Sequence, residues 1–294
     1  MLKALLKTMR LRQWIKNGFI FFALVFDKQL FLRDPFLRTL EGFFLFCLIS
    51  SSVYLVNDIA DIKADREHPE KKHRPIASGQ LPVGAAWIAA IILALVALVL
   101  GFMLSPAFAA ITAIYLVINL LYSRWLKHVP ILDVLIVSSG FVLRVAAGVA
   151  LITVERFSPW LYVVTTLFSL YIGLGKRRAE MTLLAKGAAS HRKVLDGYTI
   201  PLLDQYITIV SGMTIFAYSL YTFSAPNLPE NHSMMLTIPF VVYGIFRYLQ
   251  LIHTGHAAGA PDEVALKDRP LQITVLLWGL SVVAIFYNEI IGAR

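Results

Sequence analysis

Residues 57–79 read NDIADIKADREHPEKKHRPIASG, and this stretch decides how the rest of the sequence is interpreted. It begins at the end of a long apolar run and carries Asp58, Asp61 and Asp65. On a continuous helix, offsets of three and seven residues place all three carboxylates on one face. Because neighbouring carboxylates repel one another, this face predicts a bound cation, and oxygen ligands suit Mg²⁺. A solvated helix end, where acidic residues cost little, is the alternative.

The second half of the same stretch is basic. It contains Arg66, Lys71, Lys72 and Arg74. Cations beside metal-binding carboxylates suit a Mg²⁺-bridged diphosphate, because the acids hold the metal and the bases hold the phosphoryl oxygens. Pro69 and Pro75 disfavour a helix here, so the basic segment is predicted to fold as a loop.

The composition is that of a membrane protein. Of the 294 residues, 58% are hydrophobic and 15% are charged. Soluble domains usually carry about a quarter charged residues, and the apolar runs here approach the roughly 20 residues that a membrane-spanning helix needs. The sequence predicts an all-α, polytopic membrane bundle of nine transmembrane helices in one domain, residues 1–294. The expected spans are residues 16–33, 37–60, 82–104, 106–123, 131–152, 158–175, 200–223, 234–253 and 270–291.

Lys and Arg residues are distributed unevenly between the expected loops. Of the 27, 20 lie in the N-terminal arm and the even-numbered loops, five lie in odd-numbered loops or at the C-terminus, and two lie within spans. Because cytoplasmic loops carry the excess of basic residues, this bias predicts a cytoplasmic N-terminus. We therefore expect a multi-pass protein of the cell (inner) membrane, surrounded by membrane lipids, with its active site facing the cytoplasm.

The N-terminal arm contains a second basic cluster. Residues 10–17, RLRQWIKN, combine apolar residues with Arg10, Arg12 and Lys16. This pattern suits an interfacial helix, either as a plain membrane anchor or as a receptor for an anionic lipid head group.

Two charged residues lie deep within expected spans. Arg144 lies 11 residues after Asp133, which is about three helical turns, so the two share a face. Because a charge within the membrane is costly, Arg144 is a candidate for lining a functional cavity with Asp133, or for a buried structural ion pair. Arg247 is a candidate on the same grounds.

Two further loops on the expected cytoplasmic side mix acids and bases. Lys176 and Arg177 directly follow an apolar helix end, where they suit a phosphate clamp, with Glu180 one turn later. A surface pair between Lys176 and Glu180 is the alternative. Asp268 and Arg269 bring a second mixed cluster to this side. The charged residues are concentrated at one membrane face. This favours an enzyme over a transporter, whose sites usually lie at the midplane.

Several stretches resemble one known family. Residues 57–65, NDIADIKAD, with the following RPIASG, resemble the NDxxDxxxD motif of the UbiA-type intramembrane prenyltransferase superfamily, which the expected nine helices also fit. The stretches at 10–17, 175–180 (GKRRAE) and 261–272 (PDEVALKDRPLQ) resemble its decaprenyl-phosphate phosphoribosyltransferase branch. The second aspartate-rich motif of members that prenylate aromatic rings is missing, and basic residues stand in its place.

The resemblance implies a Mg²⁺-dependent transfer of 5-phosphoribose from 5-phosphoribosyl 1-diphosphate to a polyprenyl phosphate, with no nucleic-acid partner. It implies that Asp58, Asp61 and Asp65 hold the metal. The implied catalytic residues are Asn57, Asp58, Asp61 and Lys176. The implied substrate-binding residues are Arg10, Arg12, Lys16, Lys71, Arg74, Asp133, Arg144, Arg177, Glu180, Asp268 and Arg269.

Two alternatives remain open at this point. One keeps the fold but transfers a prenyl chain from its diphosphate to an aromatic ring. The other is a transporter or lipid-binding scaffold that catalyses no reaction. The sequence leaves open the length of the polyprenyl chain and the oligomeric state, a homo-oligomer included.

Overall fold

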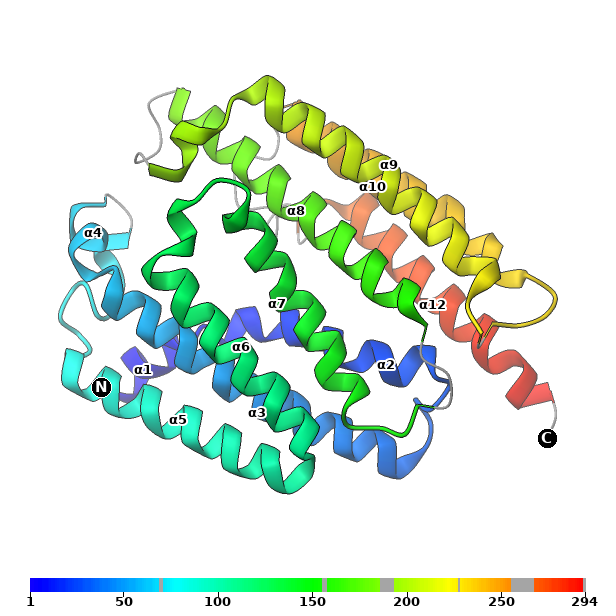
Figure 1. Ribbon diagram of the computed structural model, residues 1–294, viewed down its shortest axis with the longest axis horizontal. Coiled ribbons are helices and arrows are strands. Elements are labelled where there is room, and N and C mark those ends of the chain that lie inside the picture. Colours follow the sequence, from blue (N-terminus) through cyan, green and yellow to red (C-terminus); the bar gives the residue numbers. More distant parts are fainter. Residues whose placement is uncertain (69–70, 155–157, 186–192, 227, 255–266, 293–294) are drawn as a thin grey trace. The chain divides into compact units, whose positions relative to one another are not determined.

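The computed structural model describes residues 1–68, 71–154, 158–185, 193–226, 228–254 and 267–292 (Figure 1). All regular elements in this part of the chain are helices. The chain divides into two compact units. Unit 1 comprises Met1–Val25, Gln29–Ile136 and Gly140–Val154, and unit 2 comprises Phe26–Lys28, Val137–Ser139 and Glu155–Arg294.

Unit 1 is organised around one long helix. Its elements are α1 (Leu2–Thr8), η1 (Leu11–Ile20), most of α2 (Phe21–Phe26), α3 (Arg33–Ala60), α4 (Ile62–Glu67), η2 (Lys71–His73), α5 (Val83–Leu104), α6 (Pro106–Arg124), η3 (Leu126–His128) and most of α7 (Leu132–Val149). Helix α3 packs against α5, α6 and η1. Phe46, Ile49 and Val53 of α3 are buried against Phe108 and Tyr115 of α6. This packing holds α3 in place, and with it the polar residues at the end of the helix.

Local sequence explains the sharp turn between α5 and α6. The Ser105 hydroxyl accepts a hydrogen bond from the Phe108 amide, and Pro106 occupies the first turn, so the two residues start α6 in the way that N-caps and N1 prolines do. On α5, Ile88, Ile91 and Val99 are more than half exposed. An exposed apolar face of this length indicates contact with lipid.

Unit 2 contains α8 (Pro159–Ala185), η4 (Lys193–Gly197), α9 (Ile200–Ser224), η5 (Ser233–Thr237), α10 (Ile238–His253) and α12 (Arg269–Gly292). Helix α8 packs against α9, and α10 packs against α12 (Figure 1). Buried hydroxyl groups join the elements: Tyr218 shares a hydrogen bond of 2.6 Å with Thr237 and accepts one of 2.7 Å from the Trp278 indole. These bonds satisfy polar groups that would otherwise be costly to bury.

Seven helical segments of the described chain are long and apolar enough to cross a membrane: Arg33–Ala60, Val83–Leu104, Pro106–Arg124, Leu132–Val149, Ile200–Ser224, Ser233–His253 and Arg269–Tyr287. The predicted all-helical, multi-pass architecture is confirmed. The predicted number of nine is not confirmed. Instead of one helix, residues 16–26 form the end of η1 and the short α2, and α8 is not among the seven.

A close backbone approach predicts one strong mutational effect. An added Cβ at Gly148 of α7 would lie 2.0 Å from the Ile20 carbonyl oxygen, because the end of η1 packs directly on this glycine. Gly148→Ala is therefore expected to lower stability by about 2–3 kcal/mol, through forced backbone movement. Gly84→Ala on α5 is the matched control, since its Cβ would meet no atom within 4 Å. Thermal unfolding in detergent compares the two, and equal melting temperatures would contradict the packing described.

Candidate active site

Two buried carboxylates share one guanidinium at the end of α3. Asp58 on α3 and Asp65 on α4 are each 3% exposed. Arg74 Nη1 donates to Asp58 Oδ1 at 3.1 Å and to Asp65 Oδ2 at 2.8 Å. Arg10 Nη2 donates to the same Asp58 oxygen at 2.5 Å. Arg10, which is distant in the sequence, thus joins Asp58, Asp65 and Arg74 in one cluster, which we call the carboxylate cluster (Asp58, Asp65, Arg10, Arg74).

The loop after α4 positions Arg74. Its backbone is closed by hydrogen bonds from the Arg74 amide to the Lys71 carbonyl and from the Leu81 amide to the Pro75 carbonyl. Ile76 and Leu81 are buried in an apolar cluster with α3 and α5 and anchor the loop. Gly79 has a φ of +80°, a conformation that glycine adopts without strain. As predicted, this basic segment is not part of the long helix, and it folds back onto the acids.

The expectation that Asp58, Asp61 and Asp65 share one continuous helical face is wrong. Helix α3 ends at Ala60, and Asp61 has φ and ψ of −94° and 7°, outside the regular helical values. Its carboxylate accepts a hydrogen bond of 2.5 Å from Lys127 Nζ of η3 instead, and its side chain is 38% exposed. Among the described residues, no group of three or more His, Cys, Asp or Glu side chains is gathered as at a metal site.

The carboxylate cluster nevertheless offers the donor atoms that Mg²⁺ prefers. Asp58 and Asp65 supply carboxylate oxygens. Asn57, the residue before Asp58, has a buried Oδ1 with no hydrogen-bond partner among the described residues. Oxygen donors of this kind suit a hard cation. The metal set that the sequence predicts, Asp58, Asp61 and Asp65, stays a prediction.

The other predicted basic residues of unit 1 differ in their surroundings. The Arg10 guanidinium lies 4.8 Å from the centroid of the Tyr54 ring, in a cation–π contact. Arg12 is exposed, and Lys16 and Lys71 are half-buried. Lys127 is a residue that the sequence did not single out, because its role depends on a partner 66 positions away.

Asp133 and Arg144 are both buried on α7, but Arg144 forms no ion pair with Asp133. Arg144 donates to Asn17 Oδ1, the Gly140 carbonyl and the Tyr115 hydroxyl, at 2.8, 2.7 and 3.1 Å. The alternative of a buried ion pair between Asp133 and Arg144 is therefore wrong. Arg144 is held instead by neutral oxygens and by aromatic rings.

In unit 2, the basic end of α8 is already paired. Arg177 is 4% exposed and donates to Glu180 at 2.5 Å, one turn along the helix. The pair considered from the sequence, as the alternative to a phosphate clamp, is between Lys176 and Glu180. Lys176 is half-buried. Arg178, the third cation in the same basic run, donates to Asp204 of α9 and to the Ile252 carbonyl of α10. It therefore ties three helices together.

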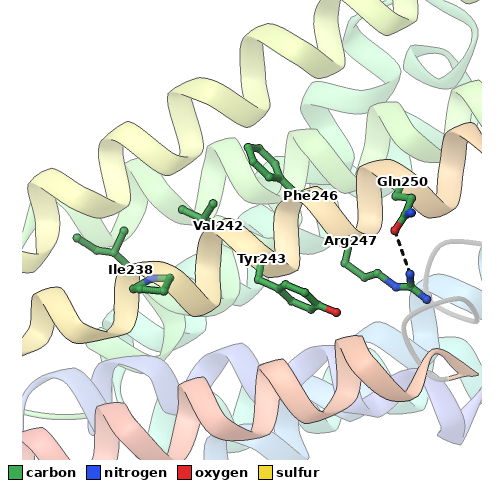
Figure 2. A pocket seen from close by; sticks show the side chains of 7 residues that line it. Ile238, Val242, Tyr243, Phe246, Arg247 and Gln250 are labelled. Carbon is green, nitrogen blue, oxygen red and sulfur yellow. Dashed lines mark hydrogen bonds between the residues drawn. The ribbon is translucent and has the colours of Figure 1, made fainter.

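The second mixed cluster of unit 2 lies between α10 and α12. Arg247 donates to both oxygens of Asp268, at 3.3 and 2.8 Å. It also donates to Gln250 at 2.9 Å, a hydrogen bond that Figure 2 shows. Asp268 also accepts from the Leu271 amide and so caps α12, while Arg269 is exposed. These hydrogen bonds, above all that from Arg247, lower the pKa of Asp268.

An open pocket of about 600 Å³ lies along α10 beside this cluster. Figure 2 shows that one side of the helix supplies its lining. Apolar side chains form most of the lining, and Arg247 and Gln250 form its polar end. Phe246 is 58% exposed, as expected for a surface that meets lipid. Arg247, a candidate because of its intramembrane position, thus has its charge compensated by Asp268.

The apolar helices and the charged residues at the end of α3 together define a multi-pass membrane protein with a buried acid–base site. The sequence profile of the UbiA prenyltransferase family matches residues 19–266. The chain belongs to this family of membrane enzymes.

Curated relatives match nearly the whole chain. The chain is 35% identical over 290 residues to a decaprenyl-phosphate phosphoribosyltransferase of Corynebacterium glutamicum, covering 96% of this chain and 86% of the relative. It is 36% identical over 306 residues to the protein of the same name in Mycolicibacterium smegmatis, covering 98% and 94%. The predicted resemblance to this branch of the family is confirmed.

Solved structures share the fold. A UbiA homolog from Archaeoglobus fulgidus bound to DMAPP and Mg²⁺ has a TM-score of 0.73 and 16% identity, covering 96% of this chain and 98% of the homolog. The same homolog bound to GPP and Mg²⁺ also has a TM-score of 0.73. At this identity the likeness establishes the fold of the chain and nothing of its substrates.

Proposed function

We propose that the protein transfers 5-phosphoribose from 5-phosphoribosyl 1-diphosphate to a polyprenyl (decaprenyl-type) phosphate and releases diphosphate. The names of the relatives at 35–36% identity support this substrate pair. The observation that carries the proposal within the chain is the carboxylate cluster, in which Arg74 bridges Asp58 and Asp65. A single acidic pair among several cations suits one metal-bound diphosphate together with a further phosphate group.

The reaction requires little activation of the nucleophile. An oxygen of the lipid phosphate, already an anion, forms a bond to C1 of the ribose, and the bond from C1 to the diphosphate oxygen breaks. No proton is transferred in this step. The barrier lies in the negative charge that develops on the leaving diphosphate, so positioned cations accelerate the reaction.

Asp58, Asp65 and Asn57 would hold Mg²⁺, with Asp61 at the edge of the site. Mg²⁺ bound there neutralises charge on the leaving diphosphate. The side chains of Arg10 and Arg74 are 31% and 30% exposed, so phosphate oxygens can reach them from solvent. We propose that these two cations exchange part of their contact with Asp58 for contacts with phosphate when the substrate binds.

The remaining proposed contacts extend this scheme. We propose that Arg12, Lys16 and Lys71 bind phosphate groups of the substrates. Asp133 is proposed to line the substrate cavity. In unit 2, the proposal assigns Lys176 the catalytic role of stabilising phosphate charge. It assigns substrate binding to Arg177, Glu180, Asp268 and Arg269. Arg177 can serve only by exchanging its contact with Glu180, and Asp268 only by exchanging its contact with Arg247.

We also propose one transmembrane domain of nine spans in the cell (inner) membrane, with a cytoplasmic N-terminus and active site. The additional spans would be formed by residues 16–33 and 158–175. The uneven distribution of Lys and Arg along the sequence supports this orientation.

The direct test incubates the purified protein with radiolabelled 5-phosphoribosyl 1-diphosphate and polyprenyl phosphate. Label is expected in the lipid fraction only when both substrates and Mg²⁺ are present, with an equal amount of diphosphate released. Transfer from a prenyl diphosphate to an aromatic acid, without labelled lipid, would instead support the ring-prenylating alternative. Absence of diphosphate release from every substrate pair would support a scaffold or transporter.

A further inference from the structure

Residues 10–20, called the arm from here on, adopt a conformation that is unfavourable for an isolated segment. Arg10 has φ and ψ of 54° and 53°, the left-handed region that is unfavourable for residues other than glycine. The following η1 is a 3₁₀ helix of 10 residues. Runs of this helix beyond about four residues are uncommon, because their hydrogen-bond geometry is poor. Contacts with other elements must therefore stabilise the arm.

Polar side chains of α3 supply some of these contacts. Trp14 Nε1 donates to the Ser51 hydroxyl at 3.1 Å. Asn17, which is 1% exposed, donates to Cys47 Sγ at 3.1 Å and to the Ser50 hydroxyl at 3.2 Å. The indole nitrogen of Trp14 and the amide nitrogen of Asn17 thus both bind the arm to α3. The amide oxygen of Asn17 contacts a different helix, α7.

That oxygen accepts a hydrogen bond from Arg144 Nε of α7 at 2.8 Å. Arg144 is 5% exposed, and its guanidinium carbon lies 5.3, 5.0 and 5.5 Å from the ring centroids of Phe46, Tyr115 and Phe141. No carboxylate of the described residues forms an ion pair with it. A charge buried at membrane depth is costly, and here neutral oxygens and aromatic faces are its only described partners.

Arg144 has no described contact with the carboxylate cluster. Its contact on α3, Phe46, precedes Asp58 by 12 residues, which corresponds to about 18 Å along a helix. The arm, however, reaches both places. Asn17 meets Arg144, and Arg10 meets Asp58.

We propose that Arg144 is a positioning residue, which fixes the arm through Asn17 so that Arg10 remains on Asp58. This inference rests on the proposed function only in that Arg10 serves the same reaction. The substrate contact that the sequence predicts for Arg144 stays a prediction beside this role. Glutamine at position 144 would retain a hydrogen-bond donor but lose the charge and the three-way contact, so the arm would detach more often.

A double-mutant cycle tests the proposal. Arg10→Ala is expected to lower kcat/KM about a hundredfold and Arg144→Gln about tenfold. If Arg144 acts through Arg10, the double variant matches Arg10→Ala to within about threefold. Independent effects would multiply to about a thousandfold, and that result would overturn the proposal. Arg144→Lys, which keeps the charge, is expected to recover part of the loss.

Limited trypsin digestion gives a readout that does not depend on activity. In Arg144→Gln, cleavage after Arg10, Arg12 and Lys16 should increase relative to cleavage elsewhere, as measured by mass spectrometry. Asn17→Ala removes the same link from the arm side and serves if Arg144→Gln does not fold. An unchanged cleavage ratio in both variants would overturn the proposal. If the wild-type protein forms no product, the proposed function is wrong. The cleavage ratio alone then tests whether Arg144 positions the arm.

Arg38→Gln provides the matched control. Arg38 of α3 is another arginine of unit 1 that donates to backbone carbonyls, those of Leu104 and Leu151, and it has no described contact with the arm. Its replacement should lower the melting temperature without changing the cleavage ratio within the arm. Its effect on kcat/KM should be independent of Arg10→Ala. Preferential cleavage of the arm in Arg38→Gln would show that general destabilisation is sufficient.

Discussion

Asp58→Asn is expected to lower the turnover number by about 10²- to 10³-fold or more while the protein remains folded. The side chain is almost fully buried and receives hydrogen bonds from both Arg10 and Arg74. Asparagine keeps the shape and an acceptor oxygen, so these bonds persist in part. It removes the charge that a metal ion and the cluster's two cations require. Turnover in the phosphoribosyl transfer assay, with thermal unfolding of the same preparation, measures both outcomes.

The control for this variant lies on the same helix. Asp34→Asn makes the same chemical change in the first turn of α3, where the carboxylate is exposed. We expect wild-type turnover from it. Wild-type turnover from Asp58→Asn as well would remove Asp58 from the metal site.

Arg74→Ala is expected to destabilise the protein in the absence of a divalent metal. Among the described residues, Arg74 is the one that contacts both buried carboxylates, so its loss leaves Asp65 without this partner and Asp58 with Arg10 as its described basic partner. Uncompensated buried charge is strongly destabilising, and we expect the apparent melting temperature to fall by about 5 °C. Because Mg²⁺ can occupy the space between the same carboxylates, it should raise the melting temperature of the variant more than that of the wild type.

Arg66→Ala tests whether the effect is specific to the carboxylates. Arg66 belongs to the same basic segment, but its guanidinium donates to the Ala77 carbonyl at 3.1 Å. Its replacement should give no additional response to Mg²⁺. If Mg²⁺ shifts the melting temperatures of Arg74→Ala and the wild type equally, the carboxylate cluster is not the metal site.

The sequence predicted best the elements whose limits are set locally. The expected spans at residues 82–104, 106–123 and 200–223 agree to within one residue with α5, α6 and α9. In these helices, an apolar run of spanning length begins after Pro82 or after a capping hydroxyl (Ser105, Thr199), so nearby residues determine where each helix starts. The basic loop after α4 was predicted for the same reason.

The sequence could not predict features that depend on distant partners. Residues 16–33 read as an apolar span, yet the arm forms a 3₁₀ helix whose contacts come from α3 and α7. Asp61 reads as the middle of an acidic face, yet α3 ends there and Lys127 binds the carboxylate. In both places, the partner lies tens to more than a hundred residues away and carries no signal in the local pattern.

The hydrogen bonds of unit 2 limit how its helices can move. Near one end of α9, Arg178 of α8 binds Asp204 and the Ile252 carbonyl of α10. Near the other end, Tyr218 binds Thr237, where α10 begins, and Trp278 of α12. Helices α9 and α10 are held together near both ends, so they cannot separate at either end without breaking these polar contacts. A rearrangement that admits a bulky lipid would therefore move α9 and α10 together.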